Sequence, residues 1–561
     1  MKQIILLAGY ILSVFASYGQ YDHCCAAKTT DKSWYSSGKA APLLPGLEGI
    51  DFAITTSNEE ALKFFRQGMM LSYGFNHAEA ARSFYEATRR DSNCALCWWG
   101  YAYVLGPNYN GGMEKDNYER AYAAVQRAQL LLTKCTAREK ALVTALAFRY
   151  PDHHVDNRVT YDSAYAAEMR KVYKQFGDDP DIASLFTESL MDMHPWDLYS
   201  KQGMPKPWTP EILDVLETAL RSFPKHAGVN HFYIHAVEAS SDPGKAIPSA
   251  DLLRDLVPGA GHLLHMPSHI YIHTGQYHDG SVANLEAVQA DSNYFTACHA
   301  QGVYPLAYFP HNYHFLAACA TLEGNGKLAM EAAYKVGEYS DKELMEKPRW
   351  ATLQHYATIP YFVAVKFGKW KEILDMPEPT LLYTKAIWQY ARGMAALGTG
   401  NMPLAEKSLA LLKPLASDTS LESLTIWDIN TLASIASIAE LVLEGEVTAY
   451  KKNYPDAINL LMHAVSQEDA LNYNEPPDWF FSVRHNLGAV LIDAGQYKDA
   501  MDVLREDLEH YKNNGWALAG LTKANQAAGE KENAYYLNKL FKWAWSHADT
   551  PITTSRILGT P

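Results

Sequence analysis

The feature of this chain that most constrains its fold is a repeated spacing of small and large apolar residues. The spacing recurs in a frame of about 34 residues, long enough for two antiparallel helices and their turns. In such a frame each small residue lets two helices approach closely, and each large residue fills the space between neighbouring hairpins. Residues 61–94 carry the clearest copy, with Phe64, Gly68, Ala80, Phe84 and Ala87 at positions 4, 8, 20, 24 and 27. The sequence therefore predicts stacked helical hairpins.

Two further copies lie in the second half of the chain and begin at residues 386 and 481. They contain Gly393, Ala405, Leu409 and Leu412, and then Leu487, Gly488, Ala500 and Leu504. This pattern resembles the tetratricopeptide repeat family and covers about residues 57–545. The resemblance implies an all-α, superhelical array of hairpins whose first helices line a concave surface. Helical periodicity dominates and no Asn-Gly or Asp-Gly turn separates alternating runs, so strands are not expected.

Breaks in the pattern divide the chain into six parts. They are a signal peptide (1–19), an irregular lead-in (20–56), N-terminal repeats (57–225), a His-rich central block (226–360), C-terminal repeats (361–545) and a tail (546–561) that we expect to be frayed.

The first 19 residues read as a secretory signal. Lys2 precedes an apolar run from Ile4 to Phe15, and small residues follow before a cut expected ahead of Gln20. No later segment offers about 18 consecutive apolar residues, so no transmembrane segment is predicted. We therefore expect an exported protein, periplasmic or secreted.

The charge of the chain argues against one class of partner, and the number of cysteines limits the disulfides. The formal net charge of −14 comes without any basic stripe, so the sequence predicts no nucleic-acid partner. Seven cysteines leave at least one unpaired, and Cys94 with Cys97 is the favoured local disulfide.

Histidines gather in the central block. Eleven of the 21 histidines fall between His226 and His314. A helix predicted over residues 229–239 places His231, His235 and Glu238 on one face, because their spacing matches the helical period. Pro267 suits the first turn of the next helix, which carries His269 and His273, and His262 and His265 are expected in the loop before it.

If these helices line one concave wall, as the resemblance implies, histidines distant in sequence become neighbours in space. Three or four imidazoles with a carboxylate suit Zn²⁺, Fe²⁺ or Cu²⁺. The preferred metal ligands are His231, His235, His265 and His269, with Glu238 as a fourth ligand or as a catalytic base behind them. Possible additional site residues are His194, His262, His273, His311 and His314.

Aromatic residues flank these histidines in sequence. Ligand pockets are rich in aromatic side chains with a few polar groups. The predicted pocket residues are Trp196, Tyr233, Tyr271 and Tyr313. The loop from Gly203 to Pro210 is a candidate cover for this pocket.

Two functions compete at this stage. The first is a metal-dependent enzyme, a hydrolase or an oxidoreductase, that acts on a small-molecule or peptide-like substrate in the groove. The second is a metal-free scaffold that binds a peptide or protein partner, with histidines that only shape the surface. His231-Phe-Tyr-Ile-His235 lacks the glutamate that follows the first histidine of a zincin helix, which argues against a zinc protease. The block is similar to exported bacterial tetratricopeptide proteins with His-x-x-x-His-x-x-Glu and His-Met-Pro-Ser-His segments; that resemblance implies fold and site, not a reaction.

Overall fold

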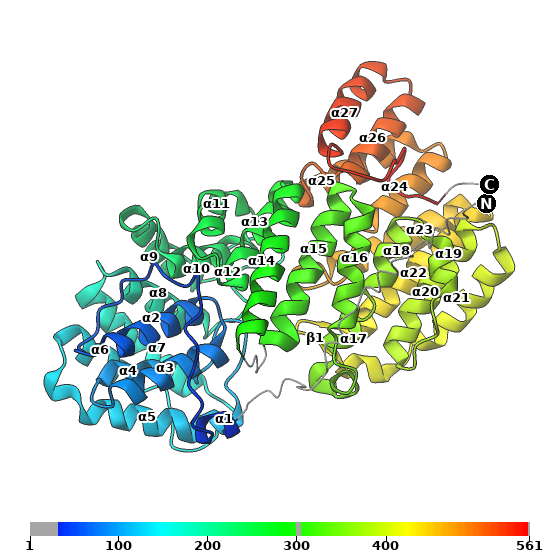
Figure 1. The fold of residues 1–561 in the computed structure, drawn as a ribbon. Coiled ribbons are helices and arrows are strands. Elements are labelled where there is room, and N and C mark those ends of the chain that lie inside the picture. Colours follow the sequence, from blue (N-terminus) through cyan, green and yellow to red (C-terminus); the bar gives the residue numbers. More distant parts are fainter. Residues whose placement is uncertain (1–31, 299–303, 559–561) are drawn as a thin grey trace, which may run out of the picture.

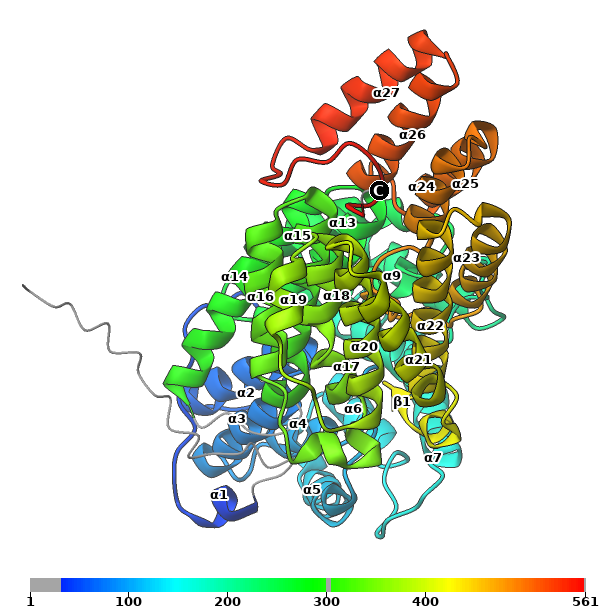
Figure 2. The ribbon, with the colours of Figure 1, turned by 90° about the vertical axis from the view of Figure 1, so that its right-hand side faces the viewer.

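The computed structural model describes residues 32–298 and 304–558, and over these ranges the fold is an all-α, tetratricopeptide-like array of helical hairpins (Figure 1). The predicted signal peptide lies outside the described residues. The array winds from the N-terminal helices through the central block to the C-terminal helices, and α27 projects from its end (Figures 1 and 2).

Helices occur in three consecutive stretches. The first contains α1 (Lys32–Ser36), α2 (Glu59–Tyr73), α3 (His77–Arg90), α4 (Ala95–Val104), α5 (Tyr118–Leu130), α6 (Ala137–Leu146), α7 (Val159–Phe176), α8 (Pro180–Met191) and α9 (Thr209–Ser222). The second contains α10 (Ala227–Val237), α11 (Ile247–Leu256), α12 (Gly261–His265), α13 (Pro267–Thr274), α14 (Tyr277–Ala297), α15 (Phe309–Glu323) and α16 (Gly326–Glu338). The third contains α17 (Thr352–Tyr356), α18 (Ile359–Lys366), α19 (Trp370–Asp375), α20 (Leu382–Gly398), α21 (Met402–Ala416), α22 (Leu432–Tyr450), α23 (Tyr454–Asp469), α24 (Arg484–Asp493), α25 (Tyr497–His510), α26 (Gly515–Ala527) and α27 (Lys531–Ala544).

Short elements connect these helices. They are η1 (Lys115–Asn117), η2 (Leu132–Lys134), η3 (Pro243–Ala246), η5 (Leu344–Glu346), η6 (Pro348–Trp350) and η7 (Thr419–Ser423), with one π-helical turn, η4 (Tyr304–Tyr308). In the described ranges the strands are β1 (Thr425–Ile426) and β2 (Asn430–Thr431), an antiparallel pair in which Ile426 faces Asn430. Each strand has two residues, too few to show an alternating pattern in the sequence, so this hairpin was not predicted.

Glycines in the repeat frame permit the close helix contacts that the spacing predicted. A Cβ on Gly68 of α2 would lie 2.8 Å from the Phe84 ring of α3, and one on Gly488 of α24 would lie 2.7 Å from Leu504 of α25. Both distances are shorter than carbon atoms tolerate, so these positions require glycine.

Two hydrophobic cores meet inside α13. Buried residues up to Tyr271 belong to the N-terminal core, and those from Ile272 onward belong mainly to the C-terminal core. The histidine-bearing helices therefore lie at the junction of the two halves of the array.

The end of the chain packs against the array. Asp549 accepts hydrogen bonds from the backbone N–H groups of Gly326 and Lys327 at the start of α16, at 2.7 and 3.0 Å. Arg556 forms buried ion pairs with Glu446 and Asp493. Residues 549–556 are therefore held by specific contacts, where the sequence analysis expected a frayed tail.

No helix in the described part of the chain is both long and apolar enough to cross a membrane. Cys94 and Cys97 are buried free thiols, so the disulfide expected between them is not formed.

Candidate metal centre

Three segments supply the central histidines. Helix α10 carries His231 and His235, and the α12–α13 segment carries His262, His265 and His269. His262 and His265 lie on the short helix α12 and not in a loop as predicted, since Met266 keeps helical angles (φ −51°, ψ −35°) between α12 and α13. Pro267 has no N–H to continue the helix, so the axis breaks there.

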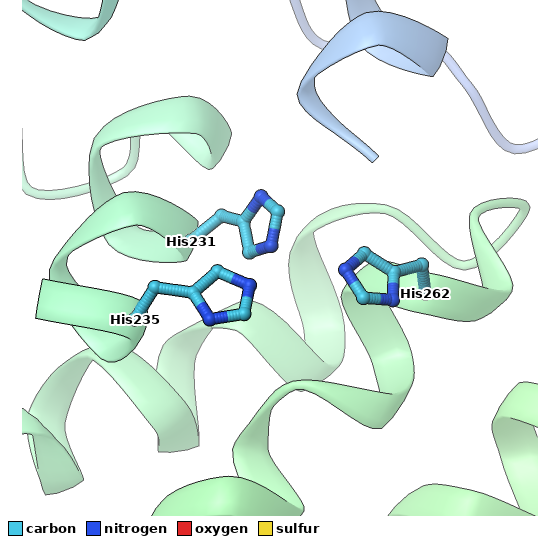
Figure 3. Close-up of side chains that lie close together, drawn as sticks. All are labelled: His231, His235 and His262. Atoms are coloured by element: carbon cyan, nitrogen blue, oxygen red, sulfur yellow. The ribbon is translucent and has the colours of Figure 1, made fainter. Parts of the chain in front are cut away.

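The histidines form two groups of three. The first histidine group is His231, His235 and His262, and the second histidine group is His265, His269 and His311, the last from α15. Within each group one ligand atom from every ring lies within 4.8 Å of the others. Figure 3 shows the first group, with two rings from α10 turned toward a third from α12. The four ligands preferred from sequence are thus divided between two groups, and each group gains one histidine.

In the first histidine group every ring has at least one nitrogen without a well-aligned hydrogen-bond partner. The ring centroids of His231 lie 4.8 Å from His235 and 5.0 Å from His262. Both ring nitrogens of His231 and of His262, and Nε2 of His235, are buried without a well-aligned hydrogen-bond partner. Buried polar atoms are rarely left unsatisfied, so five such nitrogens in one place need an explanation.

In the second histidine group two lone pairs face each other. Asn284 donates through its amide nitrogen to the Gly280 carbonyl, so its oxygen accepts from Nδ1 of His265 at 2.7 Å. Nδ1 of His269 donates to Glu238. When neither ring carries an extra proton, each has its lone pair on Nε2, and these two Nε2 atoms are 2.8 Å apart.

Glu238 joins the two groups. It caps α10, and its Oε1 accepts from Nδ1 of His235 at 2.7 Å while its Oε2 accepts from Nδ1 of His269. Burial alone would raise the pKa of Glu238, but its contacts with the two imidazoles lower it to about 2. The carboxylate thus stands behind the rings and orients them, a position typical of a group that supports metal ligands.

Burial disfavours the charged form of five of the six imidazoles. His231 and His265 are 0% exposed and His269 is 1% exposed. Burial lowers the pKa of His231, His262, His265 and His311 well below the usual value, and that of His235 in the same direction, with neighbouring histidines adding to the shift. Neutral imidazole is the form that binds metal ions.

Each group packs against one phenylalanine. The Phe75 ring lies 4.7, 5.7 and 5.4 Å from His231, His235 and His262. The Phe315 ring lies 4.8, 4.4 and 5.2 Å from His265, His269 and His311. Neither phenylalanine was predicted: Phe75 is distant in sequence from its three histidines, and Phe315, although one helical turn after His311, is distant from His265 and His269.

A cavity of about 260 Å³ opens onto both groups. His235 and His262 of the first group line it, as do His269 and His311 of the second. Its aromatic lining is Trp196, Tyr308, Trp350 and Trp427. This volume lies just below the range of about 300–1,000 Å³ usual for ligand pockets, so it suits a small molecule.

Several residues around this cavity have strained backbone angles. Phe75, Trp196, Trp427 and Asp428 have φ of 53°, 56°, 53° and 59°. Such angles are unfavourable for bulky side chains by about 1–3 kcal/mol each and persist where the surroundings impose them, commonly at functional sites. Trp427 and Asp428 form the tip of the β1–β2 hairpin and both line the cavity.

Segments far from the histidines in sequence enclose the cavity. Arg349 pairs with Glu114 at 3.1 Å, and both line the cavity. His273 pairs with Glu475, another lining residue, at 2.6 Å. The proposed cover, Gly203–Pro210, lies elsewhere: Trp208 donates to the Asp197 carbonyl, and Gly203 contacts Ser241.

Several residues predicted for the site lie outside the two groups and the cavity. His194 stacks on Trp208 at 3.8 Å, and His314 stacks on Phe480 at 4.9 Å. Tyr233 bonds to Glu217 and Tyr271 to Asp251, while Tyr313 stacks on Tyr339. Of the four predicted pocket aromatics, Trp196 lines the cavity.

Comparison with known proteins gives structural similarity alone. The chain matches no protein-family model and no curated protein sequence. It is similar to a solved structure of a human IFIT1 dimer with m7Gppp-AAAA, at 12% identity and a TM-score of 0.30, with 88% of this chain and 92% of that chain covered. It is also similar to yeast Tom70, at 12% identity and a TM-score of 0.27, with 85% of this chain and 90% of that chain covered. Neither similarity is high enough to assign a function.

Proposed function

We propose that this protein is an exported metalloprotein that binds one transition-metal ion in each histidine group and presents both ions to a small molecule in the adjoining cavity. Export rests on the signal sequence of residues 1–19. The metal ions rest on the geometry of the histidines, and the small molecule rests on the cavity that the two groups share.

The contact between Nε2 of His265 and Nε2 of His269 carries the proposal. Two lone pairs 2.8 Å apart in a buried site repel each other, and a metal ion bound by both converts that repulsion into coordination. At a tetrahedral angle, metal–imidazole bonds of about 2.0–2.1 Å place two nitrogens about 3.3–3.4 Å apart, so a bound ion would separate the two Nε2 atoms by about 0.5–0.6 Å. A proton shared by the two rings is the alternative cation; burial lowers the pKa of His265 and so disfavours a proton on that ring.

The donor set favours transition metals. Imidazole suits zinc, copper and iron, whereas calcium and magnesium prefer oxygen ligands. Three protein ligands leave a fourth position at each ion for water or a substrate atom, which is the arrangement of catalytic sites. Such ions support either hydrolysis, through a bound water, or redox chemistry.

The proposed role of Glu238 is to orient His235 and His269. Both of its oxygens already accept hydrogen bonds from those rings, and its lowered pKa makes it a weak base. A separate general base, if the reaction uses one, has to come from the cavity wall or from a metal-bound hydroxide.

Elemental mass spectrometry of the purified mature protein tests the proposal. After exposure to zinc, copper and iron salts and removal of loosely bound ions, we expect two metal ions per chain. The double variant His265→Ala, His269→Ala should lose at least the ion of the second group. The matched control is His463→Ala, His510→Ala, two exposed histidines of α23 and α25.

Circular dichroism shows whether each variant still folds. If the double variant unfolds, His311→Ala takes its place, because this ring is only partly buried. A folded wild-type protein that retains no metal ion from any of the three salts would overturn the proposal.

The scaffold hypothesis is the second candidate, and one observation favours it. Helix α27 leaves Tyr535, Tyr536 and Trp543 64%, 62% and 61% exposed. Exposed aromatic side chains are typical of protein-binding surfaces. A metal-free protein whose partner binding is abolished by Tyr536→Ala and Trp543→Ala would favour the scaffold over the metalloprotein.

A further inference from the structure

We infer that the two histidine groups form a single dinuclear copper centre that binds dioxygen between its two ions. This inference rests on the proposed function, since it names the metal and a co-substrate of the same site.

The two groups are close enough to act as one centre. His235 of the first group and His269 of the second have ring centroids 5.8 Å apart, and His262 and His265 have centroids 5.7 Å apart. Glu238 holds one ring from each group by its two oxygens, which fixes the groups relative to each other. Four of the six rings line the same cavity, so one small ligand can reach both ions.

Charge balance favours copper over zinc. In the described part of the chain, Glu238 is the carboxylate that hydrogen-bonds to the rings of these groups. Two divalent zinc ions would bring four positive charges into a buried site beside one negative charge, which is costly to desolvate. Two Cu⁺ ions bring only two positive charges, and each would have three histidine ligands.

The side chains around the two histidine groups also favour Cu⁺. Phe75 and Phe315 cover the two groups with apolar rings, and Nδ1 of His265 donates to the uncharged amide of Asn284. An apolar, weakly charged shell stabilises the lower oxidation state of a bound metal, because it disfavours added charge.

Dioxygen suits a pair of Cu⁺ ions side by side. Each Cu⁺ gives one electron to O₂, which becomes a peroxide dianion bound between two Cu²⁺ ions. The O–O single bond remains, no proton is needed, and the total charge of the two ions and O₂ is unchanged at two positive charges. The cavity supplies the space that O₂ and a small oxidisable molecule would enter.

Anaerobic loading followed by exposure to O₂ tests this inference. Full-length mature protein is saturated with Cu⁺ under nitrogen, desalted, and analysed for copper. On addition of air-saturated buffer we expect two copper ions per chain, uptake of one O₂ for each copper pair, a near-ultraviolet charge-transfer band and no Cu²⁺ signal in electron paramagnetic resonance, since the two spins couple.

Variants of each group sharpen the test. His262→Ala and His311→Ala remove one ligand from the first and the second group, and each should retain one copper ion that becomes visible in electron paramagnetic resonance after oxidation. Neither variant should take up one O₂ for every two copper ions. His463→Ala, which changes an exposed histidine of α23, should behave like the wild type.

The outcomes separate the two proposals. Two tightly bound zinc ions with no retained copper would overturn the copper inference and leave the metalloprotein intact. Two copper ions without O₂ uptake would also overturn this inference alone. A folded protein that retains neither zinc, copper nor iron would overturn both.

Discussion

The two histidine groups differ in how much of their geometry the protein fixes before a metal ion arrives. In the second group, His265 and His269 are oriented by Asn284 and Glu238, and their Nε2 atoms already converge. In the first group only His235 has such a partner. Preorganised ligands lose less freedom on binding. We therefore expect the second group to bind its ion more tightly, and the first group to tolerate a wider range of positions.

The largest expected effect comes from removing the carboxylate that both groups share. In Glu238→Gln one oxygen becomes an NH₂ group, which cannot accept a hydrogen bond from the N–H of an imidazole. Loss of a group that supports metal ligands typically lowers affinity about 10- to 100-fold, and here both ions should be affected. Competition with a chelator of known affinity measures the change.

Glu217→Gln is the matched control, because Glu217 bonds to Tyr233 away from both groups. If Glu238→Gln weakened only the ion of the second group, the two groups would be independent, and the shared role of the carboxylate would be wrong.

A steric change should break the first group alone. Gly261 precedes His262, and a Cβ at this position would lie 2.1 Å from Oδ1 of Asp291. That carboxyl group is buried and accepts from Tyr304 and Asn312, so it has little freedom to move. Gly261→Ala should displace His262, lower the free energy of unfolding by about 1–3 kcal/mol, and reduce bound metal to about one ion per chain.

Thermal unfolding and metal analysis of Gly261→Ala check both parts of this prediction. Gly495→Ala would not be a fair control, since its φ of 77° adds strain of its own; Gly337→Ala on α16 is preferable, because the nearest atom to its Cβ would be Pro360 Cγ at 3.7 Å. Retention of two ions in Gly261→Ala would show that His262 is dispensable.

A smaller change should weaken the second group alone. Asn284→Ala removes the acceptor that fixes Nδ1 of His265, so the ring can rotate or change tautomer. We expect about a 10-fold weaker affinity for one ion, at the low end of such effects, and an unchanged affinity for the other. Isothermal titration of the apo-protein resolves the two steps, and equal weakening of both would contradict the assignment of Asn284 to one group.

The sequence predicts the helical array and the place of the site, because both depend on short-range spacing. His231, His235 and Glu238 lie one helical turn apart, and such spacing is visible without a structure. His262, His265 and His269 also follow intervals of three and four, so a continuous helix could have been considered there. Reading Pro267 as the start of a new helix instead placed His262 and His265 in a loop.

The division into two groups could not be predicted from spacing. It depends on α15 bringing His311 beside α13. It also depends on Phe75 packing against the first histidine group while Phe315 packs against the second. The cavity wall depends on contacts across hundreds of residues, such as Arg349 with Glu114 and His273 with Glu475. These contacts follow from the superhelical path of the array, which local patterns do not specify.

The smallest expected effect concerns the link between α12 and α15. Asp291 connects them through two hydrogen bonds. It accepts one from Asn312 of α15 and one from the hydroxyl of Tyr304, and that hydroxyl accepts from the backbone N–H of His262 in α12. Burial raises the pKa of Asp291 to about 7, against the opposing effect of these two hydrogen bonds. Because the folded protein then holds a proton that the unfolded chain has released, the stability contribution of Asp291 is complete below about pH 4 and is lost as the pH rises through about 7.

In Asp291→Asn this part of the pH dependence should disappear, so that the variant gains about 1–2 kcal/mol relative to the wild type between pH 5 and 8, while both metal ions remain bound. Urea unfolding of the metal-free proteins across that range measures the difference. Parallel curves for the two proteins would mean that Asp291 stays ionised in the fold, and loss of one ion would mean that the link serves one histidine group more than the other.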